Sequence, residues 1–282
     1  MMKGNILLKF KEYTIKHYFL EKDKLLSISE STEYFCENAI LYNIKKPIVT
    51  VVQPYVSNKH GIIIIPGGGY RRVVYGIEGL SVAKWFASKG YTSFILSYRM
   101  PDFKINSFPF PFIDAFNSLQ FIKRWEEKQN IKLNSVGVMG FSAGGHIASN
   151  LVIQCYLNKV DINIKPDYLA LVYPVISMQK DIAHLGCKFN LIGNSSKENI
   201  YSAELNIPEE MPPVFIIHSI DDTDVSFNHS YRFFMELYKK KLSVDLHLFE
   251  KGGHGFGISE LKKTPSEKWK YLFLDWFEAK KF

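Results

Sequence analysis

Residues 136–146 read Val-Gly-Val-Met-Gly-Phe-Ser-Ala-Gly-Gly-His, and this stretch predicts a strand that turns at once into a helix. The segment from Gly140 to Gly144 fits the pattern G-x-S-x-G, in which a serine occupies a tight, strained turn between the two elements. Glycines suit such a turn because a Cβ there would clash with the strand or the helix. The helix that follows would direct its free N–H groups toward Ser142. Ser142 is therefore a candidate nucleophile, although the pattern also occurs by chance in loops.

Strands and helices alternate on both sides of this stretch. The run from Gly61 to Pro66 is apolar throughout, which suits a central strand of a parallel sheet. Residues 78–89 carry the apolar stripe of a helix that ends at Gly90. Further strands are expected at 91–98, 168–173, 214–218 and 244–249, and further helices at 112–129, 143–157, 231–238 and after a capping box at Thr264–Glu267. The alternation predicts an α/β fold with a mostly parallel central sheet and helices on both faces.

Three segments lie at the borders of this sheet. Ile48 to Val52 is a β-branched run between Pro47 and Pro54, which is typical of an edge strand. Residues 1 to about 40 are expected to form a helix or strand over the edge of the domain. Residues 174–212 are too long for an ordinary connection, so they are interpreted as a small cap insertion over the site. The whole chain, 1–282, is expected to be a single domain.

Composition and charge exclude several classes of partner. The 282 residues are 46% hydrophobic, enough for one large core. The formal charge of +7 comes from scattered lysines beside predicted helices, whereas a nucleic-acid surface needs basic residues gathered on one face. No apolar run approaches the ~20 residues of a membrane span, and no secretory h-region is visible. We expect a cytoplasmic protein without nucleic-acid or membrane partners.

The cysteines and histidines show no metal-binding spacing. Cys36, Cys155 and Cys187 are far apart and odd in number, which is typical of reduced thiols. No C-x-x-C, zinc-type Cys/His spacing or H-E-x-x-H occurs. We therefore expect neither a metal nor an organic cofactor.

A glycine-rich loop follows the strand at 61–66. Gly67, Gly68 and Gly69 would allow backbone N–H groups to approach a ligand and to point into one concavity. Neither a Walker loop nor a dinucleotide-binding fingerprint is completed here, because Tyr70 and Arg71 follow the glycines. An oxyanion-binding loop is favoured over an inert turn.

An acidic loop and a glycine-flanked histidine follow two later strands. Asp221-Asp222-Thr223-Asp224 could bind a cation, cap a helix or orient a catalytic histidine. His254 lies among four glycines, on a loop able to project it into a cleft. Residues at the carboxyl ends of parallel strands meet at one edge of the sheet. The serine, acid and histidine also occur in the chain order of an α/β-hydrolase triad.

Other histidines have weaker roles. His146 lies one turn after Ser142 on a helix expected to be buried, so packing is its favoured role. His218 ends a strand and could support the acidic loop. His184 lies in the insertion and could contact substrate.

The chain resembles the acetyl esterase/lipase branch of the α/β-hydrolases over residues 45–280, and is most similar to intracellular sugar O-acetylesterases and acetylxylan-esterase-like proteins. The segments that carry the resemblance are Ile65–Tyr70, Gly140–His146, Tyr173–Met178, His218–Val225 and Phe249–Gly255. The sequence departs from the wider group at two positions. Pro66 stands where a histidine often begins the glycine loop, and Ser226 stands where a proline is usual.

The resemblance implies a serine esterase that removes acetyl or other short acyl groups from O-acetylated sugars or oligosaccharides. It implies Ser142 as nucleophile, His254 as general base and Asp222, three residues before Val225, as the acid. The oxyanion donors would be Gly68 or Gly69 together with Ala143. Hydrolases of this type often form homodimers through an exposed sheet edge.

The substrate contacts and the alternative activities are predicted less directly from the sequence than the triad is. Tyr70, Tyr75 and the insertion are expected to border the acyl pocket, and Arg71 and Arg72 could reach a polar or acidic leaving group. The same triad serves arylformamidase-like amidases and oligopeptidase-like peptidases, which a comparison of amide with ester turnover would separate. A lipase and a non-catalytic binding protein are further alternatives; the latter commonly lacks a triad member.

Overall fold

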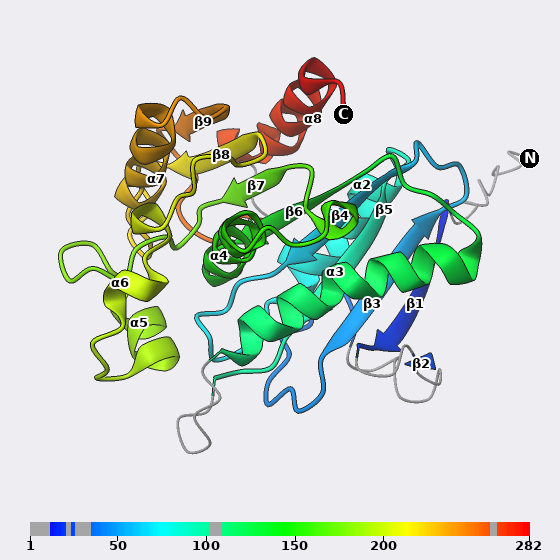
Figure 1. Ribbon diagram of the computed structural model, residues 1–282, viewed down its shortest axis with the longest axis horizontal. Helices are drawn as coiled ribbons and strands as arrows, with labels where there is room; N and C mark the ends of the chain where they lie inside the picture. The colour runs from blue at the N-terminus through cyan, green and yellow to red at the C-terminus, as the bar shows by residue number, and fades with distance from the viewer. Residues whose placement is uncertain (1–11, 21–23, 26–34, 102–108, 260–263) are drawn as a thin grey trace, which may run out of the picture.

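A nine-stranded mixed sheet runs through the computed structural model, which describes residues 12–20, 24–25, 35–101, 109–259 and 264–282 (Figure 1). The strand order is β2-β1-β3-β5-β4-β6-β7-β8-β9. The strands are β1 (Tyr13–Phe19), β2 (Lys24–Leu25), β3 (Ile48–Pro54), β4 (His60–Ile65), β5 (Thr92–Ser97), β6 (Ser135–Phe141), β7 (Leu169–Val172), β8 (Val214–Ser219) and β9 (Val244–Phe249). The six from β5 to β9 pair in parallel, and β1, β2 and β3 pair antiparallel. The predicted, mostly parallel sheet is confirmed.

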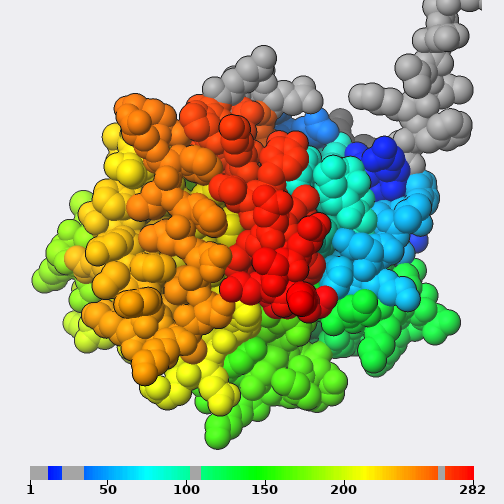
Figure 2. Space-filling model, turned by 90° about the horizontal axis from the view of Figure 1, so that it is seen from above, coloured from blue at the N-terminus to red at the C-terminus, as the bar shows by residue number. Residues whose placement is uncertain are grey.

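Helices cover both faces of this sheet. They are η1 (Gly76–Leu80), α2 (Ser81–Ala87), α3 (Phe110–Gln129), α4 (Ala143–Leu157), α5 (Leu185–Ile192), α6 (Glu198–Tyr201), α7 (Asn228–Lys239) and α8 (Trp269–Lys280), with short 3₁₀ turns η3 (Ile162–Ile164), η4 (Ala203–Leu205) and η5 (Pro265–Lys268). In Figure 1, α3 and α4 lie in front of the sheet and α2 lies behind it. The rings of Phe86 in α2 and Phe273 in α8 meet edge to face at 5.3 Å, so these two helices share a face. Figure 2 shows α8, in red, lying between the orange segment that includes β9 and the blue and cyan segments from the first third of the chain.

The core is centred on β4 and α4. The side chains of Ile62 to Ile65 are fully buried, as a strand covered on both faces requires. Helix α4 is buried along almost its whole length, because β6 and β7 lie beneath it and α3 packs against it. A helix that is apolar on every side belongs in such a position. This central placement holds the turn between β6 and α4 rigidly.

Two sequence predictions are wrong: the position of β3 at the edge of the sheet and the capping box before the last helix. Strand β3 is not an edge strand, because Tyr13–Phe19 pairs with it along its whole length and β5 pairs on its other side. Pro54 stands at its last position, where a missing N–H removes little from the ladder. The capping box at Thr264 is also absent: the Thr264 hydroxyl contacts the Ser266 hydroxyl at 2.6 Å, and η5 precedes the α-helix.

Much of the N-terminal prediction lies outside the described residues. Of residues 1 to about 40, the structure describes 12–20, 24–25 and 35 onward. Within that part, β1 and the two-residue β2 form the border of the sheet, which fits the expected strand at the domain edge.

Candidate active site

The turn after β6 holds Ser142 in a strained backbone conformation. Its φ of 51° and ψ of −121° lie where residues with a side chain are rare. A Cβ added to Gly140 would lie 2.4 Å from the carbonyl oxygen of Gly144, and one added to Gly144 would lie 2.0 Å from that of Ile65. Only glycine therefore allows strand and helix to approach this closely. The strand–turn–helix that the G-x-S-x-G pattern predicted is present, with Ser142 at the turn.

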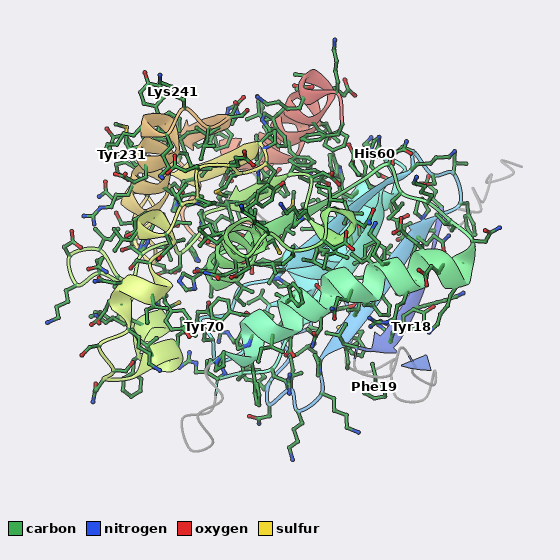
Figure 3. The ribbon with its side chains drawn as sticks, viewed as in Figure 1. Tyr18, Phe19, His60, Tyr70, Tyr231 and Lys241 are labelled. Carbon is green, nitrogen blue, oxygen red and sulfur yellow. The ribbon has the colours of Figure 1, made fainter. Side chains whose placement is uncertain are left out.

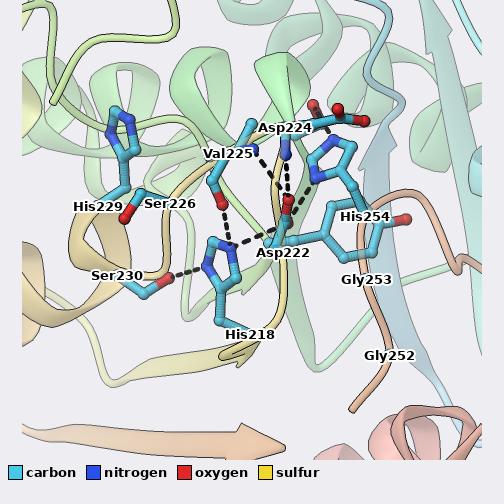
Figure 4. A network of polar contacts seen from close by, with 12 residues as sticks. His218, Asp222, Asp224, Val225, Ser226, His229, Ser230, Gly252, Gly253 and His254 are labelled. Atoms are coloured by element: carbon cyan, nitrogen blue, oxygen red, sulfur yellow. Dashed lines mark hydrogen bonds and ion pairs between the residues drawn. The ribbon is translucent and has the colours of Figure 1, made fainter. Parts of the chain in front are cut away.

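His254 connects Ser142 to an acidic loop. The Ser142 hydroxyl lies 2.8 Å from Nε2 of His254. Nδ1 of the same ring lies 2.7 Å from Oδ2 of Asp222, as Figure 4 shows. The three side chains come from the ends of β6, β8 and β9, as the parallel sheet predicted. A carboxylate can only accept a hydrogen bond, so Nδ1 of His254 carries the proton and donates it to Asp222. Nε2 is then unprotonated and can accept from the Ser142 hydroxyl.

Asp222 is held as a carboxylate inside the protein. Its Oδ1 accepts from the backbone N–H groups of Asp224 and Val225, each at 2.9 Å. Burial alone would raise the pKa of Asp222, but hydrogen bonds from His218 and His254 outweigh burial and lower that pKa well below its ordinary value. The carboxylate therefore stays ionised at neutral pH and can balance a positive charge on His254.

His218 supports the acid from the opposite side. Its Nε2 lies 3.2 Å from Oδ2 of Asp222 and 3.0 Å from the carbonyl oxygen of Val225. Both partners are acceptors, so Nε2 donates and Nδ1 accepts from the Ser230 hydroxyl at 2.7 Å. The predicted support of the acidic loop by His218 is present in this network (Figure 4).

Asp221 shapes the loop that carries His254, a role that the sequence analysis missed. Its Oδ1 accepts from the backbone N–H groups of Gly252 and Gly253 at 2.9 and 2.8 Å. Gly253 has a φ of 61°, which glycine adopts without strain. The acidic loop therefore both orients the imidazole and anchors the backbone next to it.

The glycine loop presents two free amides beside the serine. The N–H of Gly67 is bonded to Oε2 of Glu78 at 2.7 Å, whereas the N–H groups of Gly68, Gly69 and Ala143 meet no acceptor among the described residues. Gly68 and Gly69 have φ values of 130° and 66°, which a side chain would strain. Free N–H groups from this loop and from the first turn of α4 suit an oxyanion.

A cavity of about 350 Å³ opens at this constellation. Ser142, His254 and the glycine loop form one wall, and Arg71, Arg72 and Asp224 add charged groups to it. The remaining lining residues are Val74, Ile77, Glu78, His184, Gly186, Cys187, Asn190 and Gly255. Arg71 and His184, which the sequence analysis names as possible substrate contacts, both line this cavity.

Tyr70 and Tyr75 do not line this cavity, contrary to the sequence prediction. Tyr75 is fully buried, and its hydroxyl donates to Thr50 Oγ1 at 3.0 Å on the far side of the loop. Tyr70 is 2% exposed and lies near the start of α3, where its hydroxyl meets Nδ1 of His146 at 2.6 Å (Figure 3). Both hydroxyls are directed inward because each finds a polar partner within the core.

Residues 174–212 contain the short helices α5 and α6, and a part of this segment borders the cavity. Helix α5 contributes His184, Gly186, Cys187 and Asn190 to the lining. The Asn190 side-chain amide donates to the carbonyl oxygen of Gly69 at 2.8 Å, which ties this segment to the glycine loop. Behind the cavity wall, Nε2 of His146 meets the carbonyl oxygen of Tyr201 at 2.5 Å.

We expect stability to fall as the pH is lowered from about 6.5 toward 4, because His146 is buried neutral. Burial lowers its pKa to about 4, against the hydrogen bond with Tyr201. The unfolded chain binds this proton near pH 6.5, so the native state loses relative stability below that value and is unaffected above it. For this one group the loss between pH 7 and pH 5 is about 2 kcal/mol.

Urea titrations at pH 7 and pH 5 measure this loss. His146→Gln should lose less stability than the wild type over the same interval, whatever its stability at pH 7. An equal pH dependence in both proteins would contradict the assignment of the neutral buried state to His146. Burial also lowers the pKa of His17 to about 4 and that of His229 to about 3, so a part of the dependence remains in the variant.

The described residues show neither a metal-binding cluster nor a membrane-spanning helix. Within residues 12–20, 24–25, 35–101, 109–259 and 264–282, no group of three or more His, Cys, Asp or Glu side chains could hold a metal ion. Among the same residues, no helix combines the length and apolarity needed to cross a membrane.

Comparison with known proteins gives concordant matches. The BD-FAE family model matches residues 51–237. An acetylxylan esterase of Xylanibacter ruminicola is 28% identical over 212 residues, covering 73% of this chain and 42% of that protein. Endo-1,4-beta-xylanase B of Butyrivibrio fibrisolvens is 30% identical over 208 residues, covering 70% of this chain and 32% of that protein. The chain thus spans less than half the length of these curated relatives.

Solved structures agree over most of the chain. An acetyl ester-xyloside bifunctional hydrolase from Caldicellulosiruptor lactoaceticus matches with a TM-score of 0.70 and 27% identity, over 88% of this chain and 98% of that one. The carboxylesterase Cest-2923 from Lactobacillus plantarum matches with a TM-score of 0.70 and 17% identity, over 84% and 94%. At 17% identity the second match indicates a shared fold alone.

Proposed function

This chain belongs to the BD-FAE family and has the α/β-hydrolase fold, and from that premise we propose that it is a serine esterase that removes acetyl groups from O-acetylated sugars. The observation that carries the proposal is the hydrogen-bonded series Ser142, His254 and Asp222, which meets the cavity of about 350 Å³ at its serine end. The similarity to an acetylxylan esterase and to an acetyl ester-xyloside hydrolase supports acetyl as the acyl group and a sugar as the alcohol.

The reaction has two steps. Nε2 of His254 takes the proton of Ser142 as Oγ attacks the ester carbonyl, and the ionised Asp222 balances the imidazolium. The imidazolium returns its proton to the departing sugar oxygen, which leaves an acetyl group on Ser142. Water, deprotonated by His254, then attacks this acyl-enzyme and releases acetate. Free N–H groups of Gly68 or Gly69 and of Ala143 hold the negative oxygen in both steps.

The cavity supports a small polar substrate. Charged and hydrogen-bonding groups of Arg71, Arg72, Asp224 and Asn190 border the serine, and they suit the hydroxyl-rich alcohol portion of a sugar ester. Residues 174–212 act as the cap that covers this alcohol portion. Three free cysteines, two of them buried, fit the cytoplasm as the compartment. Among the described residues β9 is the last strand of the sheet, and its outer edge is the surface through which two copies would pair.

Acetate release from xylose tetraacetate tests this function. We expect hydrolysis by the wild type, little or no release from the Ser142→Ala protein, and decreasing rates for p-nitrophenyl esters as the acyl chain is lengthened. Cleavage of p-nitrophenyl acetate without cleavage of the sugar ester would remove the carbohydrate assignment and leave the esterase. Faster turnover of an acetanilide than of the matching ester would indicate an amidase, and rising rates with chain length would indicate a lipase.

A further inference from the structure

Glu78 is a buried carboxylate at the active site that the two-step mechanism does not use. It is 3% exposed, belongs to η1 and borders the cavity beside Ser142. The sequence pattern predicts Glu78 only as the first residue of a helix. An acid within the glycine-containing segment Gly76-Ile77-Glu78-Gly79 was the one signal available. Burying a carboxylate is costly unless its oxygens are hydrogen-bonded, so its partners indicate its role.

Both carboxylate oxygens have partners on the two loops that flank the serine. Oε2 accepts from the N–H of Gly67 at 2.7 Å, and Oε1 accepts from the Tyr173 hydroxyl at 3.0 Å. The same hydroxyl accepts from the N–H of Gly257 at 2.9 Å, three residues after His254. Glu78, together with the Tyr173 hydroxyl, therefore connects the glycine loop (Gly67 to Gly69) to the loop that carries His254 (Gly252 to Ile258), called the histidine loop.

The Gly67 bond sets the orientation of the oxyanion loop. A Cβ added to Gly67 would lie 2.7 Å from Cβ of Ser142 and 2.9 Å from Oε2 of Glu78, so this glycine is packed between the nucleophile and the acid. Because Glu78 accepts the Gly67 N–H, the amides of this loop that meet no acceptor among the described residues are those of Gly68 and Gly69.

The Tyr173 branch reaches His254. The Tyr173 ring meets the His254 ring edge to face, with centroids 4.8 Å apart, and Tyr173 has a φ of 39° that its contacts must maintain. Next to Glu78, the carbonyl oxygen of Ile77 also accepts from the N–H of Ile258 at 3.0 Å. The histidine loop is thus linked to η1 by one direct hydrogen bond and by a second connection through the Tyr173 hydroxyl.

We infer that Glu78 is a positioning residue that aligns the oxyanion amides with His254 and supplies a second negative charge near the imidazole. This inference rests on the proposed serine-esterase function. The titratable and charged groups that face Glu78 are His254, Arg72, Tyr173 and Tyr98. Burial raises the pKa of Glu78, and His254, the Gly67 N–H, Tyr173 and Arg72 oppose that rise.

Glu78→Gln keeps the shape and removes the charge. The glutamine oxygen can still accept from Gly67, but its NH₂ group faces a Tyr173 hydroxyl that must then find another acceptor. We expect kcat for p-nitrophenyl acetate to fall on the order of 10²-fold with KM unchanged, since oxyanion donors act in the transition state. The acidic limb of the kcat/KM profile should move to lower pH, because the imidazolium loses a neighbouring negative charge.

Two matched variants separate positioning from packing. Glu126→Gln changes another buried glutamate, which accepts from the Leu133 N–H at 2.7 Å away from the cavity, and should leave kcat and the pH profile unchanged. Tyr173→Phe keeps the charge of Glu78 but breaks the link to the histidine loop, so kcat should fall without movement of the acidic limb. A folded Glu78→Gln protein with wild-type kcat and an unmoved acidic limb would overturn the inference.

Labelling of Ser142 by paraoxon distinguishes this inference from the proposed function. The rate of phosphorylation depends on Ser142, His254 and the oxyanion amides but not on a sugar substrate. A wild type that is labelled but does not hydrolyse xylose tetraacetate loses the substrate assignment, while slower labelling of Glu78→Gln still supports the role of Glu78. Equal labelling rates in the wild type and in Glu78→Gln would overturn that role.

Discussion

Replacing Ser142 with alanine is expected to lower kcat for acetyl ester hydrolysis by at least about 10⁴-fold, with little change in stability. The Ser142 Oγ is the atom that His254 contacts at 2.8 Å, and alanine offers no nucleophile in its place. The free amides of the glycine loop would still bind the substrate carbonyl, which accounts for any residual rate. The fold should persist because the glycines at 140 and 144, and not the serine hydroxyl, allow the close approach of β6 and α4.

A second serine in α4 provides the control. Ser149 is fully buried, and its hydroxyl donates within the helix to the carbonyl oxygen of His146 at 3.1 Å. Ser149→Ala should retain wild-type turnover of p-nitrophenyl acetate. Both variants should unfold within about 1 kcal/mol of the wild type, as the loss of one hydroxyl hydrogen bond predicts. Appreciable turnover by purified Ser142→Ala would exclude Ser142 as the nucleophile.

Gly144→Ala is expected to destabilise the protein by about 3 kcal/mol or more, although alanine favours helices over glycine by about 1 kcal/mol. The added Cβ would lie 2.0 Å from the carbonyl oxygen of Ile65 and 2.5 Å from that of Pro66. Both atoms belong to the backbone at the end of β4, which cannot move aside as a flexible side chain could. Helix α4 and the central strand must therefore separate.

Urea denaturation compares this variant with a second helical glycine. A Cβ on Gly186 in α5 would meet only side-chain atoms of His184, the nearest at 3.0 Å, and a shift of a few tenths of an ångström in this side chain relieves the contact. Gly186→Ala should therefore be neutral or slightly stabilising. If Gly144→Ala unfolds at the same urea concentration as Gly186→Ala, the close approach of β4 and α4 is not a constraint in the protein.

Prediction from sequence succeeded where local sterics and chain order decide the outcome. The glycines around Ser142 suit a tight strand–turn–helix, and the apolar run at 62–65 suits a strand that is covered on both faces. Because parallel strands place their carboxyl ends at one edge, the order of serine, acid and histidine indicated that the three would meet. The structure brings Ser142, Asp222 and His254 together through hydrogen bonds of 2.8 and 2.7 Å, and their catalytic roles remain the proposal above.

The tertiary structure alone decided which way loop side chains point. Tyr75 faces Thr50 and Tyr70 faces His146, because each hydroxyl finds a partner from a distant segment; no local pattern specifies such a partner. Strand β3 became interior because residues 13–19 pair with it, and Glu78 gained its position from Gly67 and Tyr173. Sequence determines the conformations that neighbours along the chain impose. The burial of a polar group is set instead by partners far away in sequence, and these meet only when the sheet has formed.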